Sequence, residues 1–577
     1  MNRKFSCMAL LCLMLGQLCL AQSKLPDAAH YIIADSILIK TKDGAILSAV
    51  MVRKKVDLDK KLPTALMFFI YSNLERSLSE AKTAADHGYV GVVADTRGKR
   101  LSPDLIEPYE HEPQDVNEVI SWIIQQPWSD GRVGMYGGSY SGYAQWAATK
   151  YLHPALKTIV PYVAAIPGLG LPMENNIFIN PNYQWAFYVT NNKYVDQVVN
   201  NDNQRWRKMR NAWYEGGQAY RKIDSVDGTP NPWFQKWIKH PAYDRYWQAM
   251  VPYRQEYNKI NIPILSITGY YDDGQISALH YLKEHYKYNS KANHYLIIGP
   301  YDHFGAQMGG TSILRQYQVD PIALINTRAI TFQWFDFIFK NGKKPTLLQD
   351  RINYQVMGTN SWRHAKSIAQ MSDTSLTFYL SPMKLDSNYL LVKDKPSTPQ
   401  ELIQQVDFND RKSSNGDYYP DPIIKKEIDR SNGLFFISEP FRQEISINGF
   451  ITGSLKGIFN KKDLDLCLTF YEIRPDGSYF NLTYFLGRAS YQKDMSKRVL
   501  LKPGKIETID FERSRMVSKQ LSKGSRLLVV LNINKNPFAQ INYGTGKNVS
   551  DETIADAKVP LLIRWLSDSF IRVPVSY

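Results

Sequence analysis

A serine lies between glycines at the end of a predicted strand. The run Gly137-Gly138-Ser139-Tyr140-Ser141-Gly142 follows a segment rich in Val and Met at 132–136, and residues 143–151 have helical character. A nucleophile elbow forms in this strand–turn–helix setting, because glycines allow the tight turn that lifts the serine above the sheet. A glycine-rich turn with a structural serine is the alternative, since the generic motif has glycine two places after the serine and here it stands three places after.

A serine hydroxyl is a poor nucleophile at neutral pH, so a base must accept its proton. Of the ten histidines, His303 lies in a compact loop, Gly299 to Gly305, directly after an apolar segment at 294–298. Asp272 or Asp273 follows another apolar segment, 263–268, and could orient the imidazole. The order serine, acid, histidine is that of α/β-hydrolases. Taken singly, an Asp-Asp-Gly run is typical of a solvated turn and a loop histidine is usually structural.

Alternating strands and helices must position these side chains. Apolar strands are predicted at 64–70 and 89–94, and helices at 78–87 and 116–124, the second from an amphipathic stripe. This alternation predicts a parallel sheet with helices on both faces. Residues from about 170 to 250 interrupt it, being rich in Trp, Tyr, Asn and Arg, and predict a helical insertion over the sheet.

The last part of the chain changes from alternating helices and strands to strands alone. A long helix at 322–340 is expected to close the α/β unit, and strand-like segments separated by turns follow after about 345. A sandwich or jelly-roll is the expected architecture there. The predicted fold is therefore an α/β-hydrolase with a helical cap insertion, followed by a C-terminal β jelly-roll domain. The expected boundaries are a signal peptide at 1–21, hydrolase parts at 22–165 and 256–345, the cap at 166–255 and the β domain at 346–577.

An ordered series of motifs covers nearly all of the chain after residue 21. Its members are Asp95-Thr96-Arg97-Gly98 with Ser102, Gln126 to Gly131, Gly137 to Gly142, His240 to Asp244, Gly269-Tyr270-Tyr271-Asp272, Gly299 to His303, and Met357-Gly358 with Trp362. In this series the sequence resembles the cocaine esterase, α-amino-acid ester hydrolase and X-Pro dipeptidyl-peptidase group of α/β-hydrolases. The elbow of that group has glycine at the third place after serine, which accounts for Gly142.

The resemblance implies roles for five residues. Ser139 would be the nucleophile, His303 the general base and acid, and Asp272 the orienting carboxylate. The backbone N–H of Tyr140 and the hydroxyl of Tyr71 would form an oxyanion hole. Arg97 and Asp95 are interpreted as structural residues that tie the sheet edge to the helix before the elbow.

The substrate is less well defined by the resemblance. Members of the group that recognise a free α-amino group carry acids two and three places after the catalytic aspartate, where this chain has Gly274 and Gln275. Asp273 could substitute in part. In the insertion, Tyr183 and Trp185 are candidate substrate-binding residues, with core packing as the alternative for each.

The N-terminus predicts export. Arg3 and Lys4 precede an apolar stretch at 8–20, and Cys19-Leu20-Ala21 provides a cleavage site with small residues at −3 and −1. A membrane anchor and a lipidated Cys19 are the alternatives. The stretch is shorter than the ~20 apolar residues that a spanning helix needs. A periplasmic or secreted protein is therefore expected, with no membrane span after signal removal.

Composition narrows the class of partner. The net charge is +15, but the Lys and Arg residues are scattered, so no nucleic-acid partner is expected. No metal or other cofactor is expected, because the histidines lack the close pairing of a zinc motif. The expected substrates are small esters, amides or short peptides, cleaved or transferred through an acyl-enzyme. An X-Pro dipeptidyl-peptidase is the alternative, a non-catalytic glycan-binding protein is a weaker one, and homo-oligomerisation stays open.

Overall fold

The structure, a computed structural model, describes residues 29–416 and 418–577. The predicted signal peptide at 1–21 lies outside the described residues. Within them, none of the helices is both long and apolar enough to cross a membrane.

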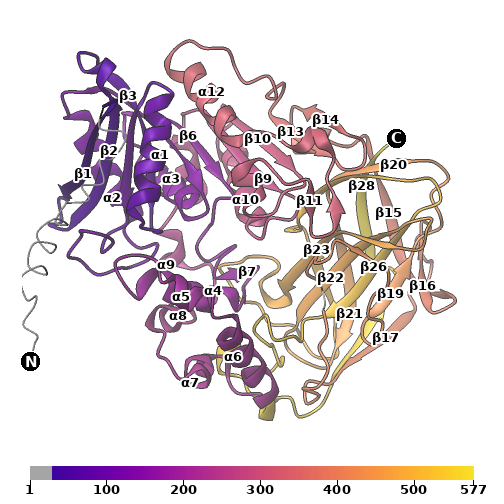
Figure 1. The fold of residues 1–577 in the computed structure, drawn as a ribbon. Helices are drawn as coiled ribbons and strands as arrows, with labels where there is room; N and C mark the ends of the chain where they lie inside the picture. Colours follow the sequence, from indigo (N-terminus) through magenta and orange to yellow (C-terminus); the bar gives the residue numbers. More distant parts are fainter. Residues whose placement is uncertain (1–28, 417) are drawn as a thin grey trace, which may run out of the picture.

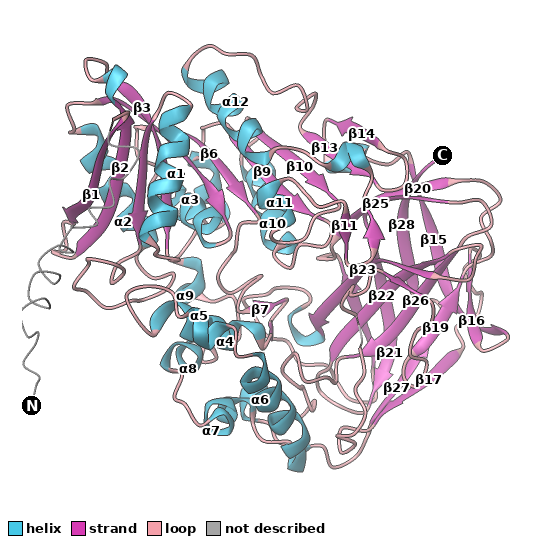
Figure 2. Cartoon of the chain, in the orientation of Figure 1, coloured by secondary structure: helices cyan, strands magenta, loops and turns pink. Residues whose placement is uncertain are grey.

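A ten-stranded, mostly parallel sheet forms the first half of the molecule (Figures 1 and 2). Its spatial order is β1-β2-β4-β3-β5-β6-β9-β10-β13-β14. All neighbours from β4 to β13 in that order are parallel, while β1 and β2 at one edge and β14 at the other run antiparallel. The strands are β1 Tyr31–Lys40, β2 Ile46–Lys54, β3 Leu62–Phe69, β4 Val90–Asp95, β5 Ser129–Gly138, β6 Leu156–Tyr162, β9 Ile264–Gly269, β10 His294–Gly299, β13 Ile352–Val356 and β14 Ser361–Ala365.

Helices cover both faces of this sheet, as the alternating pattern predicted. On one face, α3 (Tyr140–Lys150) packs against α2 (Glu112–Ile124) and α10 (Gln275–Tyr288), where the rings of Trp146 and Tyr281 stack at 4.4 Å. On the other face, α1 (Leu74–Asp86) meets α12 (Thr327–Phe339), and His87 stacks on Phe332 at 4.0 Å. The carboxyl ends of the parallel strands therefore open at one sheet edge, where ligands bind in such folds.

A helical cap rises from that edge between β6 and β9. It contains the two short strands β7 Met173–Glu174 and β8 Ile177–Phe178 and the helices α4 Pro181–Thr190, α5 Gln197–Asn200, α6 Asn203–Gly216, α7 Ile223–Asp227, α8 Pro232–Trp237 and α9 Arg245–Gln248. The loop after β4 holds the cap from below through Lys99, whose side chain is buried. Its Nζ donates hydrogen bonds to the carbonyls of Val189, Asn192 and Tyr194 at 2.8, 3.0 and 2.7 Å. The cap is thus fastened to the sheet by a buried ammonium.

The second half of the molecule is a β domain of mostly antiparallel strands. Its elements are β15 Thr374–Leu385, β16 Asn388–Val392, β17 Glu401–Val406, β18 Ile424–Lys425, β19 Leu434–Ile437, β20 Ile445–Phe450, β21 Thr452–Phe459, β22 Asp465–Ile473, β23 Tyr479–Arg488, β24 Ile506–Phe511, β25 Met516–Leu521, β26 Arg526–Ile533, β27 Leu561–Leu566 and β28 Phe570–Ser576. Phe511 of β24 packs on Phe470 and Phe485 of β22 and β23, which lie far from β24 in the sheet order. Two layers therefore enclose an aromatic core, as in a sandwich.

Two details differ from the sequence-based expectation. Strands β13 and β14 join the α/β sheet beside β10, so that sheet continues to Ala365, past the expected boundary at 345. The closing helix α12 begins at Thr327 and not near 322, because the Asn326 side chain caps it by accepting from the N–H of Ala329. The residues just before Asn326 form a short 3₁₀ turn, Pro321–Ala323.

Candidate active site

Ser139 occupies a sharp turn between β5 and α3. Its φ of 60° and ψ of −118° lie where non-glycine residues are rarely found, which is the strained geometry of a nucleophile elbow. The preceding Gly137 has a φ of 127°. Gly142 lets α3 approach the end of β6 closely, because a Cβ there would stand 2.8 Å from the backbone carbonyl oxygen of Tyr162. The displaced glycine of the motif is thus explained by helix-to-strand packing.

Asp272 and His303 meet at the ends of the neighbouring strands β9 and β10. His303 Nδ1 lies 2.9 Å from Asp272 Oδ1. The Asp272 carboxylate is fully buried and also accepts from the Thr268 hydroxyl at 2.7 Å and the Gly274 N–H at 2.9 Å. With a carboxylate as its partner, Nδ1 carries the imidazole proton and leaves Nε2 able to accept one.

The pKa values of this pair move in opposite directions. Burial acts against the charged form of each group, but their mutual hydrogen bond and attraction outweigh it. The pKa of Asp272 is lowered below 3.8, and the pKa of His303 is raised above 6.5, with smaller upward contributions from the charges of Asp273 and Asp302. Asp272 therefore stays ionised and strengthens His303 as a base.

Gln307 connects the histidine loop to the elbow. Its Nε2 donates to the His303 carbonyl at 2.9 Å. Its side chain lies directly against Gly138, where a Cβ would come within 2.1 Å of Gln307 Oε1. The loop of His303 and the turn of Ser139 are therefore in contact through one amide side chain.

Tyr71 stands on the loop after β3, beside the serine. Its hydroxyl is 3.3 Å from Ser139 Oγ, and Trp185 Nε1 donates to the same hydroxyl oxygen at 3.2 Å. Burial raises the pKa of Tyr71, so the phenol stays protonated. The Tyr71 hydroxyl therefore accepts from Trp185 and shares a second hydrogen bond with Ser139 Oγ, in which either hydroxyl can donate. Trp185, a candidate substrate-binding residue, is thus placed at the site.

Tyr140 presents its N–H at the start of α3 while its ring is held below. The hydroxyl donates to the buried carboxyl of Glu112 and accepts from the Tyr109 N–H at 2.9 Å. Its ring stacks on Tyr109 with centroids 5.0 Å apart. Burial raises the pKa of Glu112 to about 7. The residue after the nucleophile is therefore fixed at both its backbone and its side chain.

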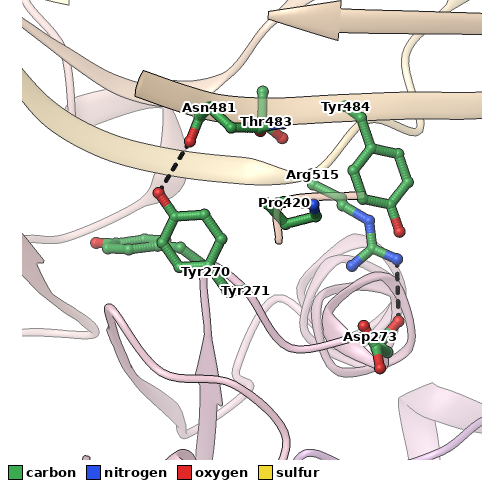
Figure 3. Close-up of a pocket in the computed structure, with 8 residues that line it drawn as sticks. All are labelled: Tyr270, Tyr271, Asp273, Pro420, Asn481, Thr483, Tyr484 and Arg515. Atoms are coloured by element: carbon green, nitrogen blue, oxygen red, sulfur yellow. Dashed lines mark hydrogen bonds between the residues drawn. The ribbon is translucent and has the colours of Figure 1, made fainter. Parts of the chain in front are cut away.

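Asp273 is exposed at the surface and directly follows Asp272, the candidate acid of the triad. Its carboxylate accepts from the Tyr419 hydroxyl at 3.4 Å, and its backbone carbonyl accepts from Arg515 at 3.0 Å. Figure 3 shows the small pocket that it lines with Arg515 and Tyr484, between the hydrolase loop and the β domain.

Tyr183 is placed away from the site, contrary to its candidate role. Its side chain is fully buried in the cap, with its ring against Phe234 and its hydroxyl 3.2 Å from Asp227. It lies two residues before Trp185 on α4, and residues two apart point about 200° away from each other on a helix. When Trp185 faces Tyr71, Tyr183 must face the cap interior.

Arg97 and Asp95 have the structural surroundings that the sequence suggested. Arg97 makes a two-bond ion pair with Asp115 of α2, at 3.0 and 2.6 Å, and Asp95 pairs with Arg100. The site residues missed by sequence reasoning are Glu112, Gln307, Glu174 and Arg515. Only Gln307 carried a signal, because it stands four residues after His303, in the short helix Gly305–Met308.

Two family models match most of this chain. Residues 43–305 match the family described as X-Pro dipeptidyl-peptidase (S15 family), and residues 348–558 match its C-terminal non-catalytic domain. The chain belongs to this S15 group of serine hydrolases. The first match contains Ser139, Asp272 and His303, and the second begins just before β13.

Similar proteins extend over almost the whole chain. The cocaine esterase of Rhodococcus sp. (strain MB1 Bresler) is 22% identical over 565 residues, covering 91% of this chain and 95% of the esterase. Among solved structures, an aminopeptidase from a marine sediment Thaumarchaeota archaeon has a TM-score of 0.79 at 17% identity, covering 95% of this chain and 97% of its own. An α-amino-acid ester hydrolase has a TM-score of 0.78 at 20% identity, with the same coverage. This S15 chain therefore has the α/β-hydrolase fold with a β-rich C-terminal domain.

Proposed function

We propose that this S15 hydrolase cleaves acyl esters or amides through an acyl-enzyme on Ser139, with His303 as general base and acid and Asp272 as its orienting carboxylate. The observation that carries the proposal is the 2.9 Å contact between His303 and the fully buried Asp272, beside a serine in elbow geometry. A triad is recognised by geometry and by the role of each group.

In the first step, His303 Nε2 accepts the Ser139 proton as Oγ bonds to the acyl carbon. The tetrahedral oxyanion would be held by the Tyr71 hydroxyl, which lies 3.3 Å from Ser139 Oγ, and by the Tyr140 N–H directly after the serine. The C–O or C–N bond to the leaving group then breaks as His303 returns the proton to it. Water deprotonated by His303 releases the acid, or an amine takes the acyl group in its place.

The direct experiment is labelling of the purified protein with a fluorophosphonate. Wild type should be labelled stoichiometrically and Ser139→Ala should not. Equal labelling of both proteins, or none of either, would overturn the proposal. A panel of p-nitrophenyl esters, amino-acid esters and dipeptidyl anilides then ranks the substrates.

A second candidate, an X-Pro dipeptidyl-peptidase, is favoured by a carboxylate near the site. Glu174 of the cap is buried. Its Oε2 pairs with Arg515 at 2.8 Å, and its Oε1 has no hydrogen-bond partner within the described residues. A carboxylate is the group that a substrate's terminal ammonium requires. Alanyl-prolyl p-nitroanilide and its N-acetylated form separate the candidates, because only the peptidase would need the free amine.

We also propose that the protein is exported by residues 1–21. The support is the charged start, apolar stretch and small-residue cleavage site in the sequence. Edman sequencing of the protein from a periplasmic or culture fraction should begin at Gln22. An N-terminus at Met1, or recovery only from the cytoplasm, would contradict export.

A further inference from the structure

An arginine of the β domain reaches the loop of the predicted catalytic acid. Arg515 lies just before β25, yet its guanidinium contacts residues about 240 positions earlier in the chain. Nη1 donates to the Asp272 carbonyl at 2.7 Å, and Nη2 donates to the Asp273 carbonyl at 3.0 Å. Nη2 also pairs with Glu174 of the cap at 2.8 Å. One side chain thus joins the β domain, the hydrolase sheet and the cap.

Neighbouring contacts repeat this connection. Gln275, at the start of α10, donates to the Met516 carbonyl at 3.0 Å and accepts from the Met516 N–H at 2.7 Å. The Tyr271 hydroxyl donates to the Asn481 carbonyl of β23 at 3.0 Å, as Figure 3 shows. The loop 271–275 is therefore bonded to the β domain on both sides of Asp272.

Burial makes the Arg515 contacts restrictive. The side chains of Arg515 and Glu174 are only 3% and 5% exposed, and the guanidinium lies 4.5 Å from the Tyr484 ring centroid. A buried charge that loses its partners is strongly unfavourable. If the loop carrying Asp272 moved away, the buried guanidinium of Arg515 would lose two of its hydrogen-bond acceptors. Arg515 therefore restricts the position of Asp272.

We infer that Arg515 is a positioning residue of the hydrolase, supplied by the domain that its family describes as non-catalytic. It acts through the backbone of Asp272, which holds the imidazole of His303, and so the β domain sets the geometry of the acid–base pair. The inference rests on the proposed function of Ser139, His303 and Asp272.

The experiment compares Arg515→Met with wild type in the full-length mature chain, using p-nitrophenyl butyrate, which has no amine. A displacement of about 1 Å can cost about 10²-fold. We expect kcat to fall about 10- to 100-fold with KM changed less than threefold. We also expect the acid limb of the pH profile of kcat/KM to move to lower pH. Asp272 raises the pKa of His303, and a weakened contact would let that pKa fall.

Three further variants make the test specific. Arg515→Met alone leaves the buried Glu174 carboxylate without its ion-pair partner. The double variant Glu174→Gln with Arg515→Met removes that charge, and it replaces the single variant in the assay if the single variant does not fold. Arg515→Lys should recover part of kcat, since one ammonium can bond some of the same oxygens but not all. Arg488→Met removes another buried arginine of the β domain, paired with Asp465 at 2.8 Å, and reports general destabilisation.

The outcomes separate this inference from the proposed function. A loss of kcat with a shifted acid limb in the Arg515 variants, but not in Arg488→Met, supports it. It is overturned if Arg515 variants that fold keep kcat within twofold, if their acid limb does not move, or if Arg488→Met loses as much. Failure of the proposed function itself would appear separately, as a wild-type protein that fluorophosphonate does not label on Ser139.

Discussion

Replacing Tyr71 by phenylalanine removes one hydroxyl from the proposed oxyanion hole and leaves its ring in place. That hydroxyl is 3.3 Å from Ser139 Oγ. The ring is supported by Tyr188 and Tyr140, whose centroids lie 5.9 and 6.4 Å away, so Phe can occupy the same position. The variant therefore tests the hydrogen bond and not the packing.

The expected effect is on the chemical step. Removing one of two oxyanion donors costs about 10²–10³ in kcat, or about 2.7–4 kcal/mol of transition-state stabilisation. The Tyr140 N–H remains, so measurable activity should persist. Trp185 Nε1 also loses its acceptor, which adds about 1–3 kcal/mol of instability if that N–H stays buried.

The assay measures kcat and KM for p-nitrophenyl butyrate together with the melting temperature. Tyr188→Phe is the matched control, since it removes a hydroxyl from the adjacent ring. The reasoning is refuted if Tyr71→Phe keeps kcat within threefold of wild type, or if Tyr188→Phe loses as much.

Three other predictions concern the same region. The pH profile of kcat/KM should rise with pH through an apparent pKa above 6.5, because His303 must be neutral to act as a base and Asp272 raises the pKa of His303. An acid limb with an apparent pKa below 6 would contradict this prediction. Glu112→Gln should gain stability relative to wild type as the pH rises from 5 to 8. Folding raises the pKa of the Glu112 carboxyl from 4.5 to about 7, so the folded wild type binds this proton more tightly than the unfolded chain. The free energy of unfolding of wild type should therefore fall by about 3 kcal/mol between pH 5 and pH 8. Urea unfolding of both proteins at the two pH values measures this change. An unchanged difference between the two proteins would disprove this. Phe304→Ala should raise KM for aryl esters more than for methyl esters, because this ring is 73% exposed beside His303, the proposed acid that protonates the leaving group. Equal changes in KM for both ester types would contradict this prediction.

The residues of the candidate site that could be placed from the sequence are those at strand ends. Ser139, Asp272 and His303 each follow an apolar strand, and parallel strands bring their carboxyl ends to one edge. The roles of Tyr183 and Trp185 could not be separated, since a helix so rich in aromatics does not reveal which side faces the cap interior. Helix propensity cannot show this, and only packing decides it.

Long-range partners were outside what the sequence could predict. Arg515 and Glu174 lie in different domains, and the sequence around a single buried charge does not predict which distant residue will pair with it. The membership of β13 in the α/β sheet was missed for the same reason, since a short apolar strand does not indicate which neighbour it will pair with. The start of α12 did carry a signal, the capping residue Asn326.

The buried ammonium of Lys99 has a consequence for how substrates are admitted. Lifting the segment from Val189 to Tyr194 would break three charge-assisted hydrogen bonds and leave the buried cation without these partners. The part of the cap that carries Trp185 on α4 is therefore preorganised before a ligand binds. Little binding energy is then spent on ordering this part of the cap when a substrate binds.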